Sequence, residues 1–403
     1  MRSNYKPLWQ YIQEVNNRNS DLSVSLLLWI SIQKIFIPSI ANTIWTDMTT
    51  YKIITKNQFG YGTVTSRNGD KISIALLDQG KAIVSQAYKV FEIIDEKELL
   101  PEYLMMWFRR SEFDRYARYM SHGSTREVFG REEMCDIQLP IPDITKQQEI
   151  VDEYNTIKDR ISLNNDLIGK LEETAQAVYR EWFVDFEFPD ENGDPYKSSG
   201  GETEYCEELE KEVPKGWKME KIKDFVGDMK NWATPSRDRQ EYRNAKDIPW
   251  IKTWEICNNI LVSAEEYISE KWFKNSSTKL LPINTVLMAM YWVTAWQVWF
   301  LKFKATTNQA CCAMICEDIN RASYLYYHLL KNQEEIASMA IGGAQPNLSK
   351  NLIEELFILD PYQNVLEECD LPKIIDFRYK KTQENENIEK VKDLILSKMA
   401  SEG

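Results

Sequence analysis

Long apolar runs and an apolar leader are both missing from this chain of 403 residues. Its most apolar stretch, residues 22–44, is broken by Gln33, Lys34 and Pro38, whereas a membrane-spanning helix needs about 18 uncharged residues in a row. The opening residues, Met-Arg-Ser-Asn-Tyr-Lys, contain no apolar core of a signal peptide. These absences predict a cytoplasmic protein with no membrane partner.

Paired cysteines of the C-x-x-C type are also lacking. Of the seven cysteines, only Cys311, Cys312 and Cys316 lie close together, and neither His122 nor His328 is beside them in the sequence. This spacing does not match a zinc site, so we predict no metal and no cofactor. Free thiols in the interior are the expected state of these cysteines.

An excess of basic charge is lacking as well, since the formal net charge is −13. The acidity is concentrated in residues 145–213, which hold 7 basic and 19 acidic residues, while residues 1–144 hold 17 of each sign. Nucleic-acid binding by the neutral flanks therefore stays open. The acidic segment either faces a protein partner or is a solvated helix surface.

Apolar residues recur at alternating spacings of four and three from Ile150 to Trp182, the pattern of a coiled-coil seam. We therefore predict a long helix over residues 145–185. Asn164, the one polar seam position, either sets the register against a polar partner or is a tolerated, hydrated side chain. The seam residues expected to bind a partner helix are Ile150, Ile157, Ile161, Asn164, Ile168, Leu171, Val178 and Trp182.

A second, more polar helix is predicted for residues 362–403, with Pro372 in its first turn. Because neither helix can bury its apolar stripe alone, we expect the two to pack antiparallel. The expected stripe of the second helix consists of Ile374, Phe377, Ile388, Val391, Ile395 and Met399.

Landmarks that precede the first helix recur in the same order before the second. Gly123 and Pro142 are 19 residues apart, and so are Gly342 and Pro361. This duplication predicts an α+β fold of pseudo-twofold arrangement, with two mixed α/β globules separated by two long antiparallel coiled-coil helices. The expected segments are globule 1–144, helix 145–185, connector 186–216, globule 217–361 and helix 362–403. Within the globules we expect strands in 72–77, 81–94, 285–289 and 310–316, and helices over 101–119 and 322–340.

Several motifs resemble the DNA-specificity subunits of type I restriction–modification systems. They occur in the family's order over nearly the whole chain, and together they are specific although each alone is weak. They are Gln147-Gln148-Glu149-Ile150, Leu171-Glu172-Glu173-Thr174-Ala175-Gln176-Ala177, Trp182-Phe183-Val184-Asp185-Phe186-Glu187-Phe188-Pro189, Thr234-Pro235-Ser236, Asp247-Ile248-Pro249-Trp250-Ile251, Thr307-Asn308-Gln309-Ala310 and Gly342-Gly343-Ala344-Gln345-Pro346-Asn347-Leu348-Ser349.

The resemblance implies two target-recognition domains, each reading one half of a bipartite site in double-stranded DNA. It also implies that the chain is not an enzyme and docks two adenine methyltransferase subunits and, in a larger assembly, ATP-dependent restriction subunits. In agreement, the chain contains neither the Asn/Asp-Pro-Pro-aromatic tetrapeptide of amino-methyltransferases nor a G-x-x-x-x-G-K-[S/T] phosphate loop. The alternative is a coiled-coil interaction scaffold without DNA recognition.

Loops that carry Arg, Asn, Gln and small residues are the expected base readers, because these side chains match base edges in the major groove. The alternative is that they are ordinary polar turns. Arg109, Arg110, Arg115 and Arg118 either contact phosphates or pair with Glu112 and Asp114. The candidate DNA-binding residues are Ser66, Arg67, Asn68, Ser121, Ser124, Arg126, Thr234, Ser236, Arg237, Arg239, Gln345 and Asn347.

Glycine is scarce and tryptophan abundant, with 15 and 13 residues respectively. Glycine usually makes up about 7% of a chain. One interpretation is that the additional indoles form aromatic platforms. The hypothesis we favour is that codons read as glycine in the source were translated as tryptophan. The positions concerned, where the family resemblance leads us to expect glycine, are Trp29, Trp45, Trp232, Trp254, Trp292, Trp296 and Trp299.

Overall fold

The computed structural model describes residues 5–40, 46–66, 68–69, 71–122, 127–230, 246–255, 259–276, 278–291, 295–339 and 348–400, with only the backbone at Trp254. The chain forms two compact units. Unit 1 comprises residues 1–162 and 386–403, and unit 2 comprises residues 163–385. Helices α4 (Ile144–Phe183) and α11 (Leu371–Lys398) each contribute one part to each unit. No helix in the described ranges is long and apolar enough to cross a membrane.

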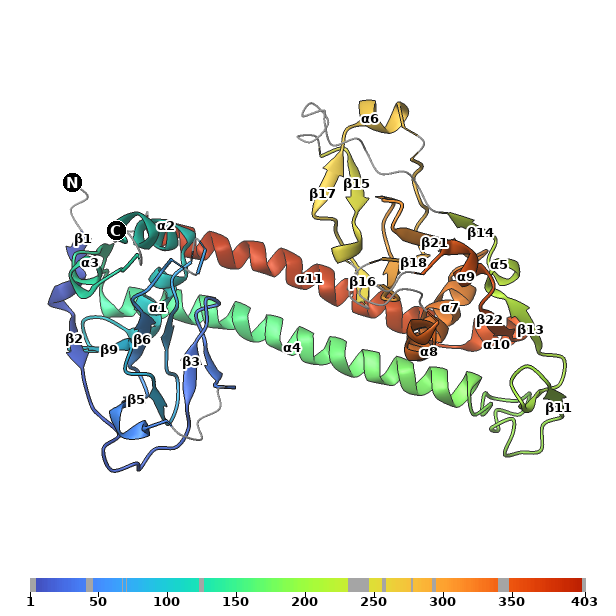
Figure 1. Ribbon diagram of the computed structural model, residues 1–403, viewed down its shortest axis with the longest axis horizontal. Coiled ribbons are helices and arrows are strands. Elements are labelled where there is room, and N and C mark those ends of the chain that lie inside the picture. The colour runs from blue at the N-terminus through green and yellow to red at the C-terminus, as the bar shows by residue number, and fades with distance from the viewer. Residues whose placement is uncertain are drawn as a thin grey trace. The chain divides into compact units, whose positions relative to one another are not determined.

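Unit 1 is built around an antiparallel sheet of four strands in the order β2-β9-β6-β7, covered by helices that follow it in the chain (Figure 1). Its sheet strands are β2 (Ile12–Val15), β6 (Phe59–Gly62), β7 (Ile74–Leu76) and β9 (Tyr88–Ile93). Paired outside this sheet are β1 (Tyr5–Pro7) with β10 (Gln138–Pro140), β3 (Leu28–Ile30) with β4 (Phe36–Pro38), and β5 (Lys52–Thr55) with β8 (Lys81–Val84). Its further helices are α1 (Pro101–Arg109), α2 (Ser111–Met120) and α3 (Arg131–Cys135).

Aromatic packing holds the helices of unit 1 to the sheet. Phe59 and Phe91 stack with ring centroids 4.8 Å apart, and Phe108 of α1 meets Phe59 edge-on at 5.8 Å. The single helix expected over residues 101–119 is wrong, because Arg110 adopts an extended backbone and separates α1 from α2. Its guanidinium carbon lies 4.2 Å from the centre of the Trp107 ring, which favours this conformation through cation–π attraction.

Unit 2 contains a sheet of five strands in the order β14-β21-β18-β19-β16 and a smaller sheet in the order β17-β15-β20. The larger sheet consists of β14 (Asp228–Lys230), β16 (Asn259–Leu261), β18 (Thr285–Ala289), β19 (Val298–Leu301) and β21 (Cys311–Ile315). The smaller consists of β15 (Ile248–Ile251), β17 (Glu266–Ile268) and β20 (Thr306–Thr307). Two further pairs are β13 (Lys218–Lys221) with β22 (Phe357–Asp360), and β11 (Thr203–Cys206) with β12 (Lys211–Pro214). Its further helices are α5 (Ile222–Phe225), α6 (Glu270–Lys274), α7 (Ile319–Lys331), α8 (Gln333–Ser338), α9 (Lys350–Glu354) and α10 (Gln363–Glu368).

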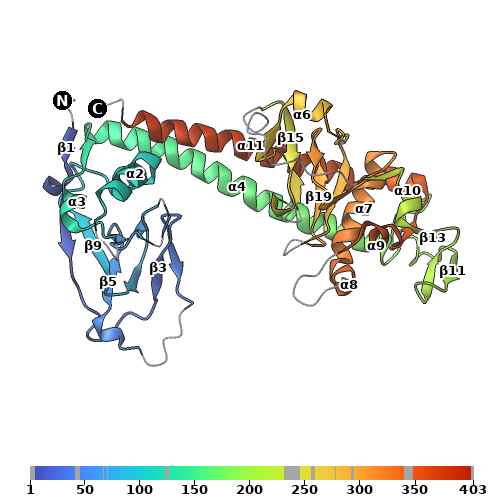
Figure 2. The same ribbon diagram turned by 45° about the horizontal axis from the view of Figure 1, so that its top comes forward.

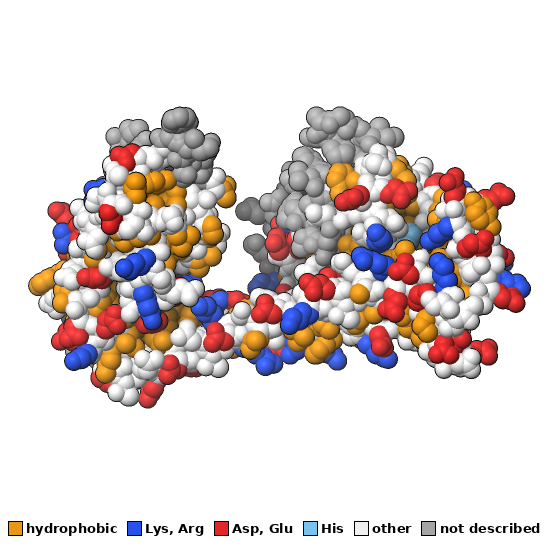
Figure 3. All heavy atoms as spheres, turned by 90° about the horizontal axis from the view of Figure 1, so that it is seen from below, with side chains coloured by type: hydrophobic (Ala, Val, Ile, Leu, Met, Phe, Trp, Pro, Cys, Tyr) orange, Lys and Arg blue, Asp and Glu red, His pale blue; other side chains and the backbone are white. Residues whose placement is uncertain are grey.

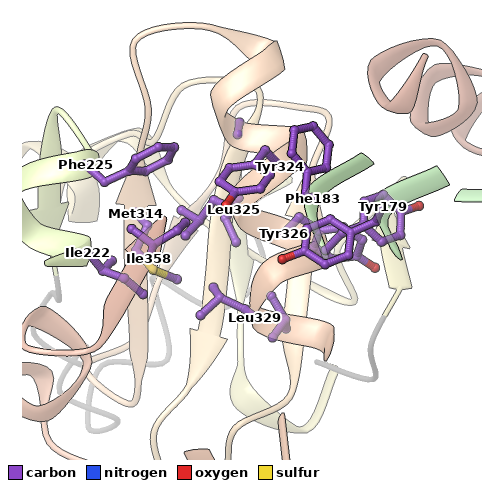
Figure 4. Packing of buried hydrophobic residues seen from close by; sticks show 14 of the residues in the cluster. Tyr179, Phe183, Ile222, Phe225, Met314, Tyr324, Leu325, Tyr326, Leu329 and Ile358 are labelled. Atoms are coloured by element: carbon purple, nitrogen blue, oxygen red, sulfur yellow. The ribbon is translucent and has the colours of Figure 1, made fainter. Parts of the chain in front are cut away.

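The end of α4 forms part of the core of unit 2. Tyr179 and Phe183 are 5% and 4% exposed and belong to the same apolar cluster as Leu325 and Leu329 of α7 (Figure 4). The ring of Phe183 lies 4.6 Å from that of Tyr324. The family motif that ends the long helix is therefore explained by packing, since its aromatic residues are core residues of this unit.

The two units repeat the same internal hydrogen bonds. The Leu8 amide donates to the Ile137 carbonyl at 2.8 Å, and the Ile222 amide donates to the Leu356 carbonyl at 2.8 Å. In addition, the Tyr103 hydroxyl donates to a carbonyl of β10 at 3.1 Å, as the Tyr324 hydroxyl does to a carbonyl of β22 at 2.6 Å. The helix expected over 322–340 is also divided, into α7 and α8, as its counterpart in unit 1 is.

Within each unit, the part of α4 that the unit contains lies beside its part of α11 (Figures 1 and 2). In unit 2 the Asn164 Nδ2 donates to the Asn385 Oδ1 at 2.8 Å, and Glu172 further along α4 pairs with Arg378 earlier on α11. In unit 1, Ile150 of α4 shares an apolar cluster with residues near the end of α11, among them Met399. The polar partner required for a register role of Asn164 is therefore present.

The second helix differs from expectation in its start and in its buried stripe. It begins at Leu371 instead of 362, because an extended residue, Cys369, separates it from α10. Phe377 and Val391 of the expected stripe are 44% and 46% exposed. The stripe is wrong there because polar residues of α11, above all Arg378, occupy the buried face instead and are satisfied by partners on α4.

Candidate nucleic-acid interface and helix seam

Two of the loops expected to read bases meet in unit 1. The Thr65 amide donates to the Glu127 carbonyl at 3.0 Å, and the Thr65 hydroxyl donates to the Ser121 hydroxyl at 2.9 Å. Ser121 in turn donates to the Ala117 carbonyl at 2.6 Å. Ser121 therefore joins the end of α2 to the loop after β6, and its hydroxyl faces protein. Ser66 is exposed beside this junction, so the loop that carries it is the described part of the candidate interface in unit 1.

Asn68 lies in the same loop and is half-buried, with its Nδ2 donating to the Val64 carbonyl at 3.4 Å. The remaining candidate base readers lie outside the described residues. They are Arg67, Ser124, Arg126, Thr234, Ser236, Arg237, Arg239, Gln345 and Asn347.

Three of the four arginines in and between α1 and α2 form ion pairs with glutamates. Arg110 and Arg115 approach Glu112 at 3.5 and 3.6 Å, and Arg118 pairs with Glu127. Asp114, the second acid of the pairing alternative, binds Lys34 at 2.8 Å instead.

Lys34 is a buried cation that the sequence reasoning missed. Its ammonium group donates to Asp114 at 2.8 Å, and its side chain is 5% exposed. Burial lowers the pKa of Lys34, and the neighbouring Asp114 opposes that shift. A signal was available, because Lys34 is the only charged residue within 22–40.

The β3–β4 hairpin consequently presents an uncharged, apolar surface. Trp29 and Ile37 face each other across the hairpin and are 40% and 37% exposed, and Ile35 is 47% exposed. Figure 3 shows hydrophobic side chains gathered on the part of the molecule that contains unit 1. The exposed side chains of the two hairpin strands are uncharged and give no contacts to phosphates, so the polar loops stay the candidate interface.

All eight seam residues of α4 are buried or half-buried. Asn164, at 3% exposed, is the most polar of them, and the Asn385 Nδ2 donates onward to the Asn165 Oδ1 at 2.9 Å. Buried amides without a partner are costly, so this amide chain favours one register of the two helices.

Gln147 anchors the start of α4 to unit 1. Its side chain is fully buried and makes three hydrogen bonds to backbone groups. Its Oε1 accepts from the Leu100 amide at 2.9 Å, and its Nε2 donates to the carbonyls of Glu98 and Pro142, both at 2.8 Å. This residue opens the first of the motifs quoted above, and its role is structural.

Comparison with known proteins decides the family. The sequence profile described as "Type I restriction modification DNA specificity domain" matches residues 31–173 and again residues 214–361. The chain belongs to this family. Its specificity-subunit relatives include that of the type I restriction enzyme MjaIX of Methanocaldococcus jannaschii, 24% identical over 85% of this chain and 77% of the relative. That of the enzyme HindI of Haemophilus influenzae is 23% identical over 86% of each chain.

A solved structure also supports the fold of this specificity subunit. The crystal structure of a type I restriction–modification system S subunit from M. genitalium superimposes with a TM-score of 0.58. The superposition covers 98% of this chain and 95% of that chain. The sequence identity is 13%, a level at which the likeness concerns the fold alone.

Three of the questioned tryptophans of this specificity subunit are described. Trp296 has a φ of +63°, in the left-handed region that favours glycine. Trp299 is 4% exposed and its indole N–H has no partner among the described atoms, whereas Trp29 lies exposed on β3. The backbone at Trp296 supports the glycine hypothesis, which stays a prediction. Trp45, Trp232, Trp292 and the side chain of Trp254 lie outside the described residues.

A cavity of about 670 Å³ in unit 2 is lined by α7, α8, α9 and the end of α4. His328 lies in its wall, with its Nδ1 3.2 Å from the Tyr179 hydroxyl and its Nε2 3.1 Å from the Phe357 carbonyl. Burial lowers the pKa of His328 to about 4. The six cysteines that the structure describes are free, and no cluster of metal-ligating side chains occurs among the described residues.

Proposed function

We propose that this specificity subunit binds double-stranded DNA sequence-specifically, reads a bipartite target, and directs adenine methylation and restriction by partner subunits. The observation that carries the proposal is that the family profile matches twice, once in each half of the chain. The repeated hydrogen bonds of Leu8 and Ile222 support a duplicated unit. The target-recognition domains would be 1–144 and 217–361, related by pseudo-twofold symmetry and joined by the connector 186–216.

The paired helices act as the spacer between the half-sites in this proposal. Each domain gains roughly 1–3 kcal/mol of discrimination per base pair read, and joining two domains on one spacer multiplies their specificities. The α4 seam packs against α11 within the chain. External partners would therefore use the outer faces of the helices, of which that of α4 belongs to the acidic segment 145–213. We propose two adenine methyltransferase subunits there, joined by ATP-dependent restriction subunits in the larger, cytoplasmic assembly.

The test is to co-express the chain with the methyltransferase gene adjacent to its own and to map methylated adenines by single-molecule sequencing. The expected result is a split motif with a fixed gap, and deleting seven residues from each helix should change that gap. A stable complex that leaves DNA unmethylated would favour the coiled-coil scaffold instead. Because of the questioned tryptophans, the experiment includes a version with glycine at those seven positions.

A further inference from the structure

One buried cation, Arg378, joins four elements of unit 2. Its side chain is 4% exposed, and its Nη1 forms an ion pair with Glu172 of α4. The same nitrogen donates to the Tyr327 hydroxyl of α7 at 3.1 Å, and Nη2 donates to the Asn259 Oδ1 at 3.4 Å. Asn259 is the first residue of β16, at the edge of the five-stranded sheet. A single guanidinium on α11 therefore contacts α4, α7 and the five-stranded sheet.

A second cation makes the same connection one strand further into the sheet. Lys302, directly after β19, donates to Asp376 of α11 at 2.6 Å and to the Asn284 Oδ1 at 2.9 Å. Its side chain is 10% exposed. Since β16 and β19 are neighbours, the edge of the sheet is attached to α11 through Asn259 of β16 and through Lys302 directly after β19.

Such a network contributes more to geometry than to stability. The desolvation of a buried ion pair largely offsets its attraction, and an apolar replacement of both partners is often neutral or stabilising. Charged hydrogen bonds are directional, however, and a planar guanidinium with several partners tolerates little displacement. The arrangement therefore restricts how the sheet lies on the two helices within unit 2.

No counterpart of this network occurs among the described residues of unit 1. The landmark spacings align Arg378 with Asp159 and Tyr327 with Met106, and they align Glu172 with Val391 of α11. Asp159 is exposed and Val391 is 46% exposed, so no buried ion pair forms at the equivalent place among the described residues. The attachment is a property of one recognition domain and not of the duplicated plan.

We propose that Arg378 is a positioning residue for target recognition by the second domain. It holds the five-stranded sheet of this domain in one orientation on the helices, so that the domain meets its half-site correctly. This proposal rests on the proposed function. It predicts a one-sided effect: loss of the network relaxes discrimination at one half-site and leaves the other unchanged.

The test uses the complex with the methyltransferase subunit and DNA duplexes substituted in either half of the mapped target. The main variant is the double substitution Arg378→Met with Glu172→Leu, which leaves no unpaired buried charge between them. The single Arg378→Met variant keeps Glu172 buried and alone, and Arg378→Lys keeps the charge without the planar contacts. The matched control is Lys373→Met, which removes an exposed ion pair between the same helix and Asp370, the residue directly before it.

The double variant should fold with a thermal midpoint near that of the wild type. Its KM for the intact target should rise about 10- to 100-fold with a smaller change in kcat, because misplacement weakens binding geometry. Discrimination should fall at one half-site only. Arg378→Lys should lie in between, and Lys373→Met should match the wild type.

Two results would overturn the proposal: unchanged KM and discrimination in the folded double variant, or an equal loss at both half-sites. Failure of the proposed function is a different result. In that case the wild-type complex itself would methylate no split motif.

Discussion

Replacing Gln147 by leucine should detach the start of α4 from unit 1. The side chain is fully buried and uses its whole amide, since Oε1 accepts from the Leu100 amide and Nε2 donates to two carbonyls. Leucine fills a similar volume, so the change removes hydrogen bonds and creates little cavity. A buried backbone group that loses its partner costs about 1–3 kcal/mol.

The magnitude follows from the surroundings of the three backbone groups. Glu98 is exposed, so its carbonyl can be rehydrated, whereas Leu100 and Pro142 are only partly accessible. Two orphaned groups, partly offset by the apolar gain of leucine, give a net loss of about 2–4 kcal/mol. For a unit of this size the expected fall in Tm is roughly 5–15 °C.

The neighbouring Gln148 provides the matched control. It is exposed, and among the described residues its Nε2 donates only to the Asp152 Oδ1 at 2.8 Å on the same helix, so Gln148→Leu should cost about 0.2–0.5 kcal/mol. The assay is thermal and urea unfolding, combined with hydrogen exchange of the Leu100 amide. The reasoning is refuted if Gln147→Leu is no more destabilising than Gln148→Leu, or if Leu100 keeps its protection.

Three further predictions concern the helix register, pH and the tryptophans. Asn164→Leu should cost about 1–3 kcal/mol because it leaves the Asn385 Oδ1 without its donor, and adding Asn385→Leu should recover part of that loss although it also removes the bond to Asn165. Additive losses in a urea double-mutant cycle would contradict this. Because the folded pKa of His328, about 4, lies below its ordinary 6.5, stability should be complete above pH 6.5 and fall as pH drops toward 4. A His328→Gln variant with the same Tm-versus-pH slope as the wild type would refute that cause. At Trp296, where φ is +63°, glycine should be more stable than alanine by about 1 kcal/mol, since both lose the indole and only alanine keeps the backbone strain; equal unfolding midpoints would contradict the left-handed conformation.

The strongest periodic signal in the sequence predicted the longest element well. The helix expected over 145–185 is α4, Ile144–Phe183, because a seam repeated over many turns is a sum of independent positions and tolerates one polar member. Strand β18, Thr285–Ala289, coincides with the expected run because all five of its residues are buried. The breaks at Arg110 and Asn332 were not predictable, since apolar spacing continues across both.

The candidate interface was less predictable than the fold. Base readers are chosen by loop chemistry, and loops carry no periodicity that fixes where a side chain points. Ser121 illustrates this limit, because a small polar residue after a helix is equally suited to read DNA or to bind its own backbone, and here it donates to Ala117. Lys34 was overlooked for the opposite reason, since a lone charge in an apolar run was taken only as evidence against a membrane helix.

The second long helix, α11, shows why a search for apolar residues alone misses part of the buried face of a paired helix. Its expected stripe included Phe377, which is exposed, and passed over Arg378, which is buried. A spacing of alternating four and three residues fits the buried face from Leu371 to Met399 just as it fits α4, but several of its middle positions are polar. Those polar positions are buried because α4 supplies their partners, as Glu172 does for Arg378. The pattern becomes visible only when both helices are considered together, since Arg378 and Asn385 are each explained by a residue more than 200 positions away.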